Sequence, residues 1–380
     1  MRDEVIESWG PEAGIAESGA DYDAERQAWI GFNLVSGVGP VRTERLLDLF
    51  GALADAWSAA PARLRHVLDD GTIERLVQIR NGGEVDATIE RMNETGVVVV
   101  LLTDADYPAL LAEIPAPPPL LYVQGDLLRS DREAVAIVGT RRMTAYGRDM
   151  TASISAGLAR AGVTVISGLA LGVDGAAHQA ALDAGGRTIA VKGCGIAHPY
   201  PATHRNLSAA IVGNGVLIAE YPPDRKPDAA NFPARNRIIS GLSLATVVIE
   251  APERSGALIT VSFAADQGRE VFVVPGDVRS LMSAGCNALL RDGARAVRSA
   301  EDILEDLNIG GRATASPTQT ALPMDDAERR VIDQLTREPR HIDEIAAALG
   351  APIHQIATQL MMLELMGSVR NTGAQHYALS

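Results

Sequence analysis

Arginines and glycines recur in this chain directly after short apolar runs. The first such segment is Gly-Thr-Arg at 139–141, and the densest is Arg-Asn-Arg at 235–237, where a helix is expected to begin. Guanidinium groups bind phosphates in a forked geometry, and glycines let main-chain N–H groups approach an anion at a helix start. Because cations at the positive end of a helix are disfavoured without an anion, the 235–237 block indicates a phosphate site.

Three further turns carry similar residue types. Gly168 and Gly172 follow a second apolar run, Lys192 ends a third, and Ser255 and Gly256 stand where a later helix is expected to begin. A lysine at the end of a buried strand is poorly explained as a solvated side chain, and a Ser-Gly turn can form an anion nest. Together these turns would line a track for several phosphates, which favours a nucleic-acid backbone over a mononucleotide.

Motifs for catalysis and cofactor binding are missing from the sequence. It has no Gly-Lys-Ser/Thr phosphate loop, no Gly-x-Gly-x-x-Gly after the first strand and no His-x-x-x-His. Asp174 fits a helix N-cap, and His178, one turn later, is expected to be structural and to bond to that cap. Cys194 has no candidate base. We therefore expect no catalytic residue, metal or cofactor. The chain has only two cysteines, Cys194 and Cys286, which fits a reducing, cytoplasmic compartment.

The elements that must position these residues lie in the predicted domain 96–309, and they alternate from Glu133 to about Ile309. Short β-branched runs alternate with Ala-rich helical segments, and the runs are apolar throughout, so both faces of the sheet are expected to be covered. In such a parallel sheet, ligands bind beyond the carboxyl ends of the strands, where the segments above fall. The predicted parallel strands are 134–138, 163–166, 188–191, 216–218, 246–249 and 271–274, with a further buried strand at 97–102.

The flanking regions differ from this α/β domain. We interpret 1–22 as a mobile acidic tail, 23–95 as a small all-α domain, 310–323 as a linker and 324–380 as a winged-helix domain. Gly-Val-Gly-Pro at 37–40 is typical of a helix–hairpin–helix turn, which can bind a DNA phosphate, but its acidic surroundings favour a structural connection. The third winged-helix segment, 353–366, has no lysine or arginine, which favours a protein-contact or structural role over reading the major groove.

The net charge of −14 over 380 residues argues at first against a nucleic-acid-binding protein, whose surface is usually basic. The regional charges differ, however: −12 over 1–130, +4 over 131–300 and −6 over 301–380. The α/β region is therefore the net-positive part. The apolar fraction is 47%, and the longest apolar run is far shorter than the ~20 residues that a membrane span needs, so we expect a soluble protein.

Several motifs occur in one order along the chain: Gly-Thr-Arg at 139–141, Gly-Val-Asp at 172–174, Tyr-Pro at 200–201, Phe-Pro-Ala-Arg-Asn-Arg at 232–237 and Val-Pro-Gly at 274–276. In this combination the chain resembles the DNA-processing protein A family (DprA, also called Smf), most closely over about 120–300. The resemblance implies an α/β fold: an extended Rossmann-like parallel sheet core between a small all-α sterile-alpha-motif-like N-terminal domain and a C-terminal winged-helix domain.

The resemblance also implies a function. Members of such a family are expected to bind single-stranded DNA as homodimers, protect incoming strands, displace single-strand-binding protein and load the RecA recombinase during natural transformation, without catalysis. By its matching motifs, the resemblance also implies that Thr140 contacts phosphate together with the arginines and that Ser167 shapes the groove. The predicted DNA phosphate-binding set is Gly139, Thr140, Arg141, Ser167, Gly168, Gly172, Lys192, Arg235, Asn236, Arg237, Ser255 and Gly256.

Two other functions compete with this one. A nucleotide phosphoribohydrolase of the lysine-decarboxylase-like type would use the same architecture, but its Pro-Gly-Gly-x-Gly-Thr-x-x-Glu motif is missing, and the nearest stretch, 255–260, lacks the glutamate. A protein adaptor that meets DNA only incidentally would keep its affinity for oligo-dT after Arg235→Ala plus Arg237→Ala.

Overall fold

The computed structural model describes residues 23–309, 326–336, 339–365, 369–373 and 375–379. The chain divides into two compact units, Met1–Arg312 and Ala313–Ser380. The tail predicted for 1–22 and the linker predicted for 310–323 lie outside the described residues.

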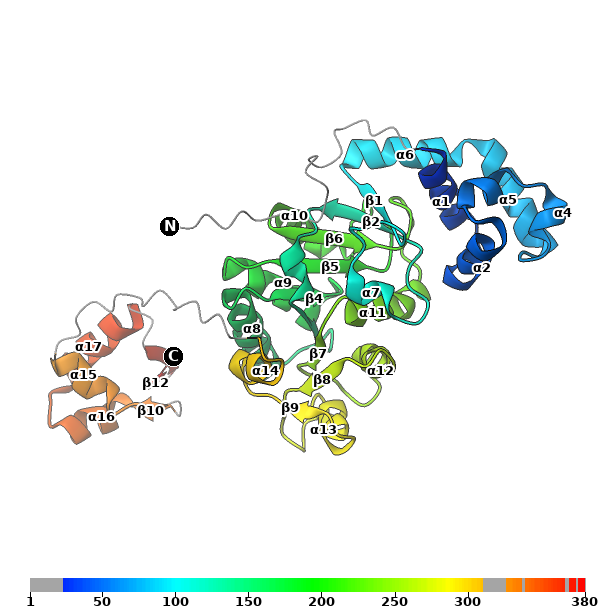
Figure 1. Ribbon diagram of the computed structural model, residues 1–380. Coiled ribbons are helices and arrows are strands. Elements are labelled where there is room, and N and C mark those ends of the chain that lie inside the picture. Colours follow the sequence, from blue (N-terminus) through cyan, green and yellow to red (C-terminus); the bar gives the residue numbers. More distant parts are fainter. Residues whose placement is uncertain (1–22, 310–325, 337–338, 366–368, 374, 380) are drawn as a thin grey trace. The chain divides into compact units, whose positions relative to one another are not determined.

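Within the described residues, a nine-stranded sheet forms the centre of the first unit, in the order β1-β2-β6-β5-β4-β3-β7-β8-β9 (Figure 1). The strands from β3 to β9 pair in parallel, which confirms the predicted sheet, whereas β1 and β2 extend it in antiparallel register beyond β6. The strands β2 and β9 were not among those predicted. The bounds are β1 Val98–Leu101, β2 Leu120–Gly125, β3 Ala134–Val138, β4 Thr164–Ser167, β5 Thr188–Lys192, β6 Gly215–Ala219, β7 Ala245–Val248, β8 Glu270–Val273 and β9 Arg295–Ala296.

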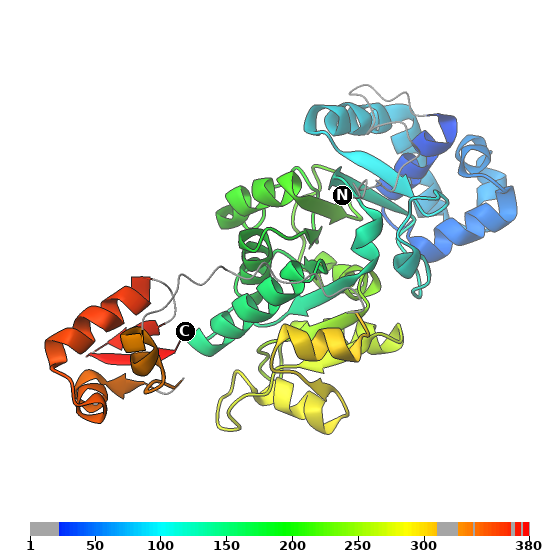
Figure 2. The same ribbon diagram turned by 60° about the vertical axis from the view of Figure 1, so that its left-hand side comes forward.

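Helices cover both faces of this sheet (Figure 1, Figure 2). Side chains alternate between the faces along a strand, so in β3 Val135 and Ile137 join one core while Ala136 and Val138 join the other. This two-sided burial explains why the strands are apolar throughout. The first core includes α8 (Ala145–Arg160), α9 (Val173–Asp183) and α14 (Ala300–Asp306); the second includes α7 (Ala109–Ala112), α11 (Asn231–Gly241), α12 (Ala257–Asp266) and α13 (Ala284–Arg291), while α10 (Arg205–Gly213) packs on α9 and β6.

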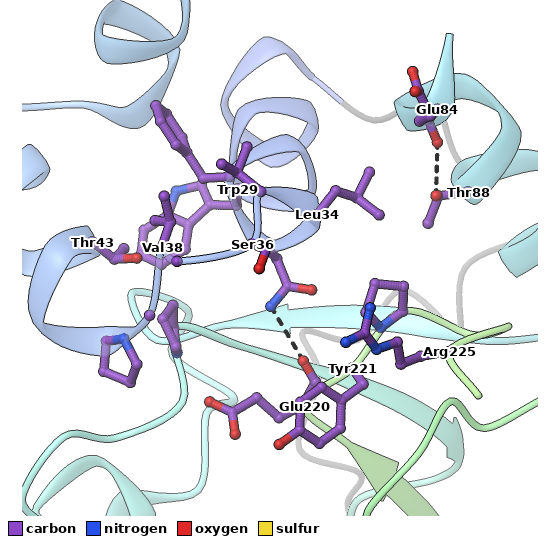
Figure 3. A pocket seen from close by; sticks show the side chains of 18 of the residues that line it. Trp29, Leu34, Ser36, Val38, Thr43, Glu84, Thr88, Glu220, Tyr221 and Arg225 are labelled. Atoms are coloured by element: carbon purple, nitrogen blue, oxygen red, sulfur yellow. Dashed lines mark hydrogen bonds between the residues drawn. The ribbon is translucent and has the colours of Figure 1, made fainter. Parts of the chain in front are cut away.

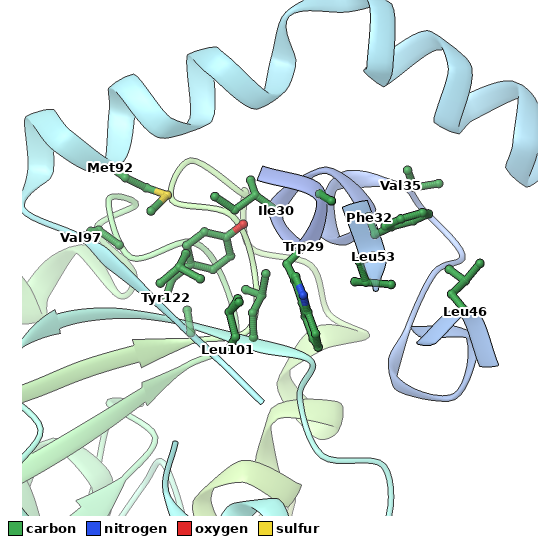
Figure 4. Packing of buried hydrophobic residues seen from close by; sticks show 14 of the residues in the cluster. Trp29, Ile30, Phe32, Val35, Leu46, Leu53, Met92, Val97, Leu101 and Tyr122 are labelled. Atoms are coloured by element: carbon green, nitrogen blue, oxygen red, sulfur yellow. The ribbon is translucent and has the colours of Figure 1, made fainter. Parts of the chain in front are cut away.

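The N-terminal helices share a core with the antiparallel edge of the sheet. In Figure 4, Trp29 and Ile30 lie beside Leu101 and Tyr122, whose strands are β1 and β2. The Tyr122 hydroxyl also donates to Asn33 Oδ1 at 3.2 Å. The predicted all-α segment is therefore joined to the sheet inside one unit. Its helices are α1 (Ala24–Leu34), α2 (Pro40–Phe50), α3 (Leu53–Ser58), α4 (Pro61–Leu64), α5 (Asp70–Gly82) and α6 (Glu84–Thr95).

The turn between α1 and α2 has the hairpin shape that the sequence predicts. Gly37 has φ +98°, a conformation that favours glycine, and Pro40 begins α2. Two arginines hold the carbonyls of this turn: Arg42 Nη1 donates to Gly37 O at 2.8 Å, and Arg75 Nε donates to Ser36 O at 3.0 Å. These internal partners agree with a structural connection.

The second unit is a winged helix, as predicted. Its helices pack over a three-stranded sheet in the order β10-β12-β11, counted over the described residues of this unit. On α17, Ile353, Met361 and Met362 are 52%, 65% and 48% exposed. The elements are α15 (Asp326–Ile332), β10 (Arg340–His341), α16 (Ile342–Leu349), α17 (Ile353–Leu365), β11 (Val369–Gly373) and β12 (His376–Leu379). Across the described parts of both units, no helix has the length and apolar character needed to cross a membrane.

The shared core predicts how the first unit unfolds. Trp29 is 2% exposed, so Trp29→Ala should lower the free energy of unfolding by about 3–5 kcal/mol. Trp29 shares its core with residues of β1 and β2. In the variant, as in the wild type, the helices and the sheet should therefore unfold in one transition in urea, which circular dichroism can follow. Val41→Ala, at a side chain 52% exposed on α2, is the control and should change stability by less than about 0.5 kcal/mol. Separate transitions for the helices and the sheet would contradict the shared core.

Candidate nucleic-acid interface

A groove of about 870 Å³ lies at the carboxyl ends of β3 and β7. From β3 the chain builds the sheet toward β6, and β7 then returns to the opposite side of β3. This is the topological switch point, where open α/β sheets bind ligands. From the predicted set, the groove is lined by Gly139, Thr140, Arg141, Arg235, Asn236, Ser255 and Gly256.

The turn after β3 carries the exposed cations of the groove. Arg141 and its neighbour Arg142 are both exposed, and neither forms an ion pair with any residue that the structure describes. Thr140 is held in place: its N–H donates to Glu250 O at 2.7 Å, and its hydroxyl accepts from the Arg142 N–H at 3.2 Å. At Gly139, an added Cβ would press on the side chain of Val173. That glycine is therefore needed for the packing of α9 against β3.

A buried carboxylate occupies the start of α8, where the sequence suggested a phosphate. Glu250, 2% exposed at the end of β7, accepts from the Thr144 N–H at 2.8 Å and from the Thr144 hydroxyl at 2.6 Å. Gly147 leaves room for it, since an added Cβ would overlap the carboxylate. The positive end of α8 is thus neutralised from inside the protein, and the exposed arginines remain as anion ligands.

The turn after β4 is also built from internal bonds. The Ser167 hydroxyl is buried and donates to Ile137 O at 2.6 Å, so it faces the core and not the groove. Gly172, with φ +80°, brings the turn against the main chain of Thr140 and Arg141. Asp174 lies in the first turn of α9 and accepts from the Ala170 N–H at 3.3 Å. Burial raises the pKa of the Asp174 carboxyl, and the nearby Arg235 opposes this shift.

His178 is structural, as expected, but its predicted partner was wrong. Its Nδ1 lies 2.6 Å from the hydroxyl of Thr188, which itself donates to Val165 O at 2.7 Å, and Asp174 is not involved. Burial, with smaller effects from His204 and Arg235, lowers the pKa of His178 to about 3. The ring is therefore neutral at physiological pH.

Lys192 has main-chain partners in place of the predicted phosphate. It is 3% exposed, and its Nζ donates to Ile196 O at 2.9 Å and to His198 O at 2.7 Å. Burial lowers the pKa of this ammonium group. The lysine thus holds the turn that follows β5, and we leave it out of the groove.

The 235–237 block does not act as one cluster. Successive residues on a helix point about 100° apart, and here Arg235 turns into the interior while the Asn236 amide approaches Gly256 O at 3.4 Å. Arg237 turns to the other side and pairs with Glu220 at 2.6 Å. It lines a second cavity, of about 710 Å³, beside the N-terminal helices, where Figure 3 shows Glu220 and Tyr221 below Trp29. Of the three, Asn236 and the largely buried Arg235 border the groove, and Arg237 does not.

The loop before α12 completes the groove. The Ser255 hydroxyl accepts from the Ala257 N–H at 3.3 Å, and Gly256 is exposed at the start of the helix. Sequence reasoning gave no role to the aromatic pair opposite: the rings of Tyr200 and Phe232 lie 5.3 Å apart and line the same groove, with Tyr200 41% exposed. The signal was present, because both residues stand in the quoted motifs and aromatics make up only 4% of the chain.

The described residues contain no group of three or more histidine, cysteine, aspartate or glutamate side chains placed to hold a metal ion. The chemistry that the groove offers is therefore that of guanidinium groups, main-chain N–H groups, an amide and aromatic faces, which suits a phosphate backbone with attached bases.

The chain is similar to known proteins over most of its length. The family model for DNA recombination-mediator protein A matches residues 98–308, and that for the DprA winged helix domain matches 314–374. Protein Smf of Synechocystis sp. is 35% identical over 393 residues, which cover 93% of this chain and 99% of that protein. The putative DNA processing protein DprA of Mycobacterium tuberculosis is 44% identical over 238 residues, covering 62% of this chain and 61% of the relative.

Solved structures extend the comparison to the fold. DNA processing protein A of Streptococcus pneumoniae matches with a TM-score of 0.66 and 32% identity, covering 74% of this chain and 97% of the other. The protein of the same name from Helicobacter pylori, studied for its single-stranded DNA binding mode, matches with a TM-score of 0.50 and 29% identity, covering 56% and 95%. With one family model spanning more than half of its length and a relative aligned over nearly all of it, the chain belongs to the DNA recombination-mediator protein A (DprA/Smf) family.

Proposed function

We propose that the chain binds single-stranded DNA in the groove at the β3–β7 switch point. The observation that carries this proposal is the pair Arg141 and Arg142, two exposed cations without ion-pair partners among the described residues, in the lining of a groove of about 870 Å³. The arginines would contact phosphates, and Tyr200 and Phe232 would offer faces on which bases stack. The structure from Helicobacter pylori, with its single-stranded DNA binding mode, supports the same ligand.

The wider role that we propose follows from this ligand. The chain would act by binding and without catalysis, in the cytoplasm and as a homodimer. It would protect single strands that enter the cell, displace single-strand-binding protein and load RecA during natural transformation. The family membership and the DNA processing proteins among its relatives support this proposal.

The arginine contacts can be tested through their salt dependence. Binding of oligo-dT, followed by fluorescence anisotropy, should weaken steeply with salt, because phosphate contacts release counterions. Arg141→Ala with Arg142→Ala should weaken binding and reduce the slope of log K against log salt by about 0.7 for each lost contact. Arg65→Ala removes a charge from the N-terminal helices, where Arg65 pairs with Asp70, and serves as the control. An affinity that does not change with salt, or a slope of log K against log salt that is the same in the double variant and in the wild type, would refute phosphate binding by these arginines.

The aromatic contacts should respond differently. Tyr200→Ala and Phe232→Leu should each weaken oligo-dT binding by about 1–3 kcal/mol, the size of a base–aromatic stacking contact, and should leave the salt slope unchanged. The same anisotropy titrations measure both quantities. Unchanged affinity in both variants would remove the bases from the proposed contact.

The RecA-loading role needs a separate assay. On single strands covered with single-strand-binding protein, the wild-type chain should shorten the lag before RecA hydrolyses ATP, and it should slow digestion of bare strands by a nuclease. The Arg141→Ala, Arg142→Ala double variant should do neither, because it cannot hold the strand. Equal stimulation of RecA by the wild type and the double variant would separate the loading role from the groove.

A further inference from the structure

Arg235 lies in the interior, although it belongs to the block that predicted a phosphate site. The residue is 5% exposed, and its Nη1 donates to the carbonyl oxygen of Gly168 at 2.7 Å and also to that of Val191. Both oxygens belong to the main chain at the carboxyl edge of the sheet. The Nη1 group of this guanidinium is therefore engaged by the protein, while Nε is buried without a partner among the described residues and the side chain also borders the groove.

The two carbonyls stand where the ladder between β4 and β5 ends. The parallel register runs through Ser167 and Ala190, so Gly168 and Val191 would form the next pair. Instead the chain leaves β4 after Ser167, while β5 continues to Lys192. Buried carbonyls need donors, and Arg235 supplies one between the separating strands. The guanidinium thus fixes the point at which the 168–172 loop leaves the sheet.

The loop is shaped to receive this side chain. An added Cβ at Gly168 would overlap the guanidinium, so the glycine allows the approach of Arg235 and not that of a DNA phosphate. Asp174, 8% exposed, accepts from the Ala170 N–H at 3.3 Å and interacts electrostatically with Arg235. The 168–174 segment is held between the buried Arg235 guanidinium and the buried Asp174 carboxyl group.

The loop in turn supports the exposed arginine of the groove. Gly172 lies so close to the main chain of Thr140 and Arg141 that an added Cβ would overlap both. The Val173 N–H also donates to Thr140 O at 3.2 Å. A displacement of the 168–172 loop would therefore move the turn that carries Arg141.

We propose that Arg235 is a positioning residue for the DNA groove, which sets the place of Arg141 through the 168–172 loop and makes no phosphate contact of its own. This inference rests on the proposed function, since it concerns the same groove. It differs from what the Arg-Asn-Arg motif suggests, where both arginines would count as DNA ligands.

A double-mutant cycle tests the inference. Arg235→Gln should weaken oligo-dT binding about tenfold in the wild-type background, because a charge-assisted bond that holds the loop is lost. In an Arg141→Ala background the same change should weaken binding less than about twofold, because the contact that it positions is already gone. Arg65→Gln, on the N-terminal helices, is the matched control for the loss of one charge and should be silent in both backgrounds.

The outcomes separate the two proposals. If Arg235 contacts phosphate directly, its loss should be as large in the Arg141→Ala background as in the wild type, and that additive result would overturn the inference while leaving DNA binding intact. The inference would also be overturned if Arg235→Gln left the affinity for oligo-dT unchanged in both backgrounds. A wild-type chain that does not bind oligo-dT would instead refute the proposed function. If Arg235→Gln does not fold, as judged by circular dichroism, Gly168→Ala displaces the guanidinium from the loop side and enters the same cycle.

Discussion

The main-chain groups at the carboxyl edge of the parallel sheet need hydrogen-bond partners where the strand ladder stops, and buried side chains supply them. Arg235 donates to the carbonyl of Gly168 after β4 and to that of Val191 in β5. Lys192 donates to two carbonyls in the turn after β5, and Ser167 donates to the carbonyl of Ile137 in β3. Glu250 accepts from the N–H and hydroxyl of Thr144. These contacts help to set where each turn leaves the sheet, and turns placed in this way line the groove.

The electrostatics of the groove follow from that arrangement. Two carboxylates, Asp174 and Glu250, lie buried at the starts of α9 and α8, so the positive ends of both helices have partners inside the protein. The surface cations Arg141 and Arg142 are left to face the solvent. A chain of net charge −14 can in this way present a local positive site, because most of its acidic residues lie in 1–130 and 301–380, and Asp174 and Glu250 beside the groove are buried.

The sequence predicted the parallel sheet, the winged helix and the edge of the sheet that carries the groove, since continuous apolar runs and glycine-rich turns report burial and chain direction. It did not predict side-chain directions within the 235–237 block, because these depend on how α11 is rotated against the sheet. The partners of Lys192 and Ser167 were missed for a related reason: main-chain carbonyls have no sequence signature. Strand β2 escaped prediction although it pairs with β1, some twenty residues earlier, as well as with β6, some ninety residues later, because neither pairing leaves a local signal in the sequence.

The core beneath the N-terminal helices has a consequence for synthesis. Trp29 and Phe32 leave the ribosome early, but the same cluster includes Ile211, Leu217 and Ala219, which emerge far later. Since domains made vectorially complete their packing only when the last strand arrives, we expect the helical segment to remain loosely packed until β6 pairs with β2. The nascent chain would then expose apolar surface of the N-terminal helices until β6 has been translated.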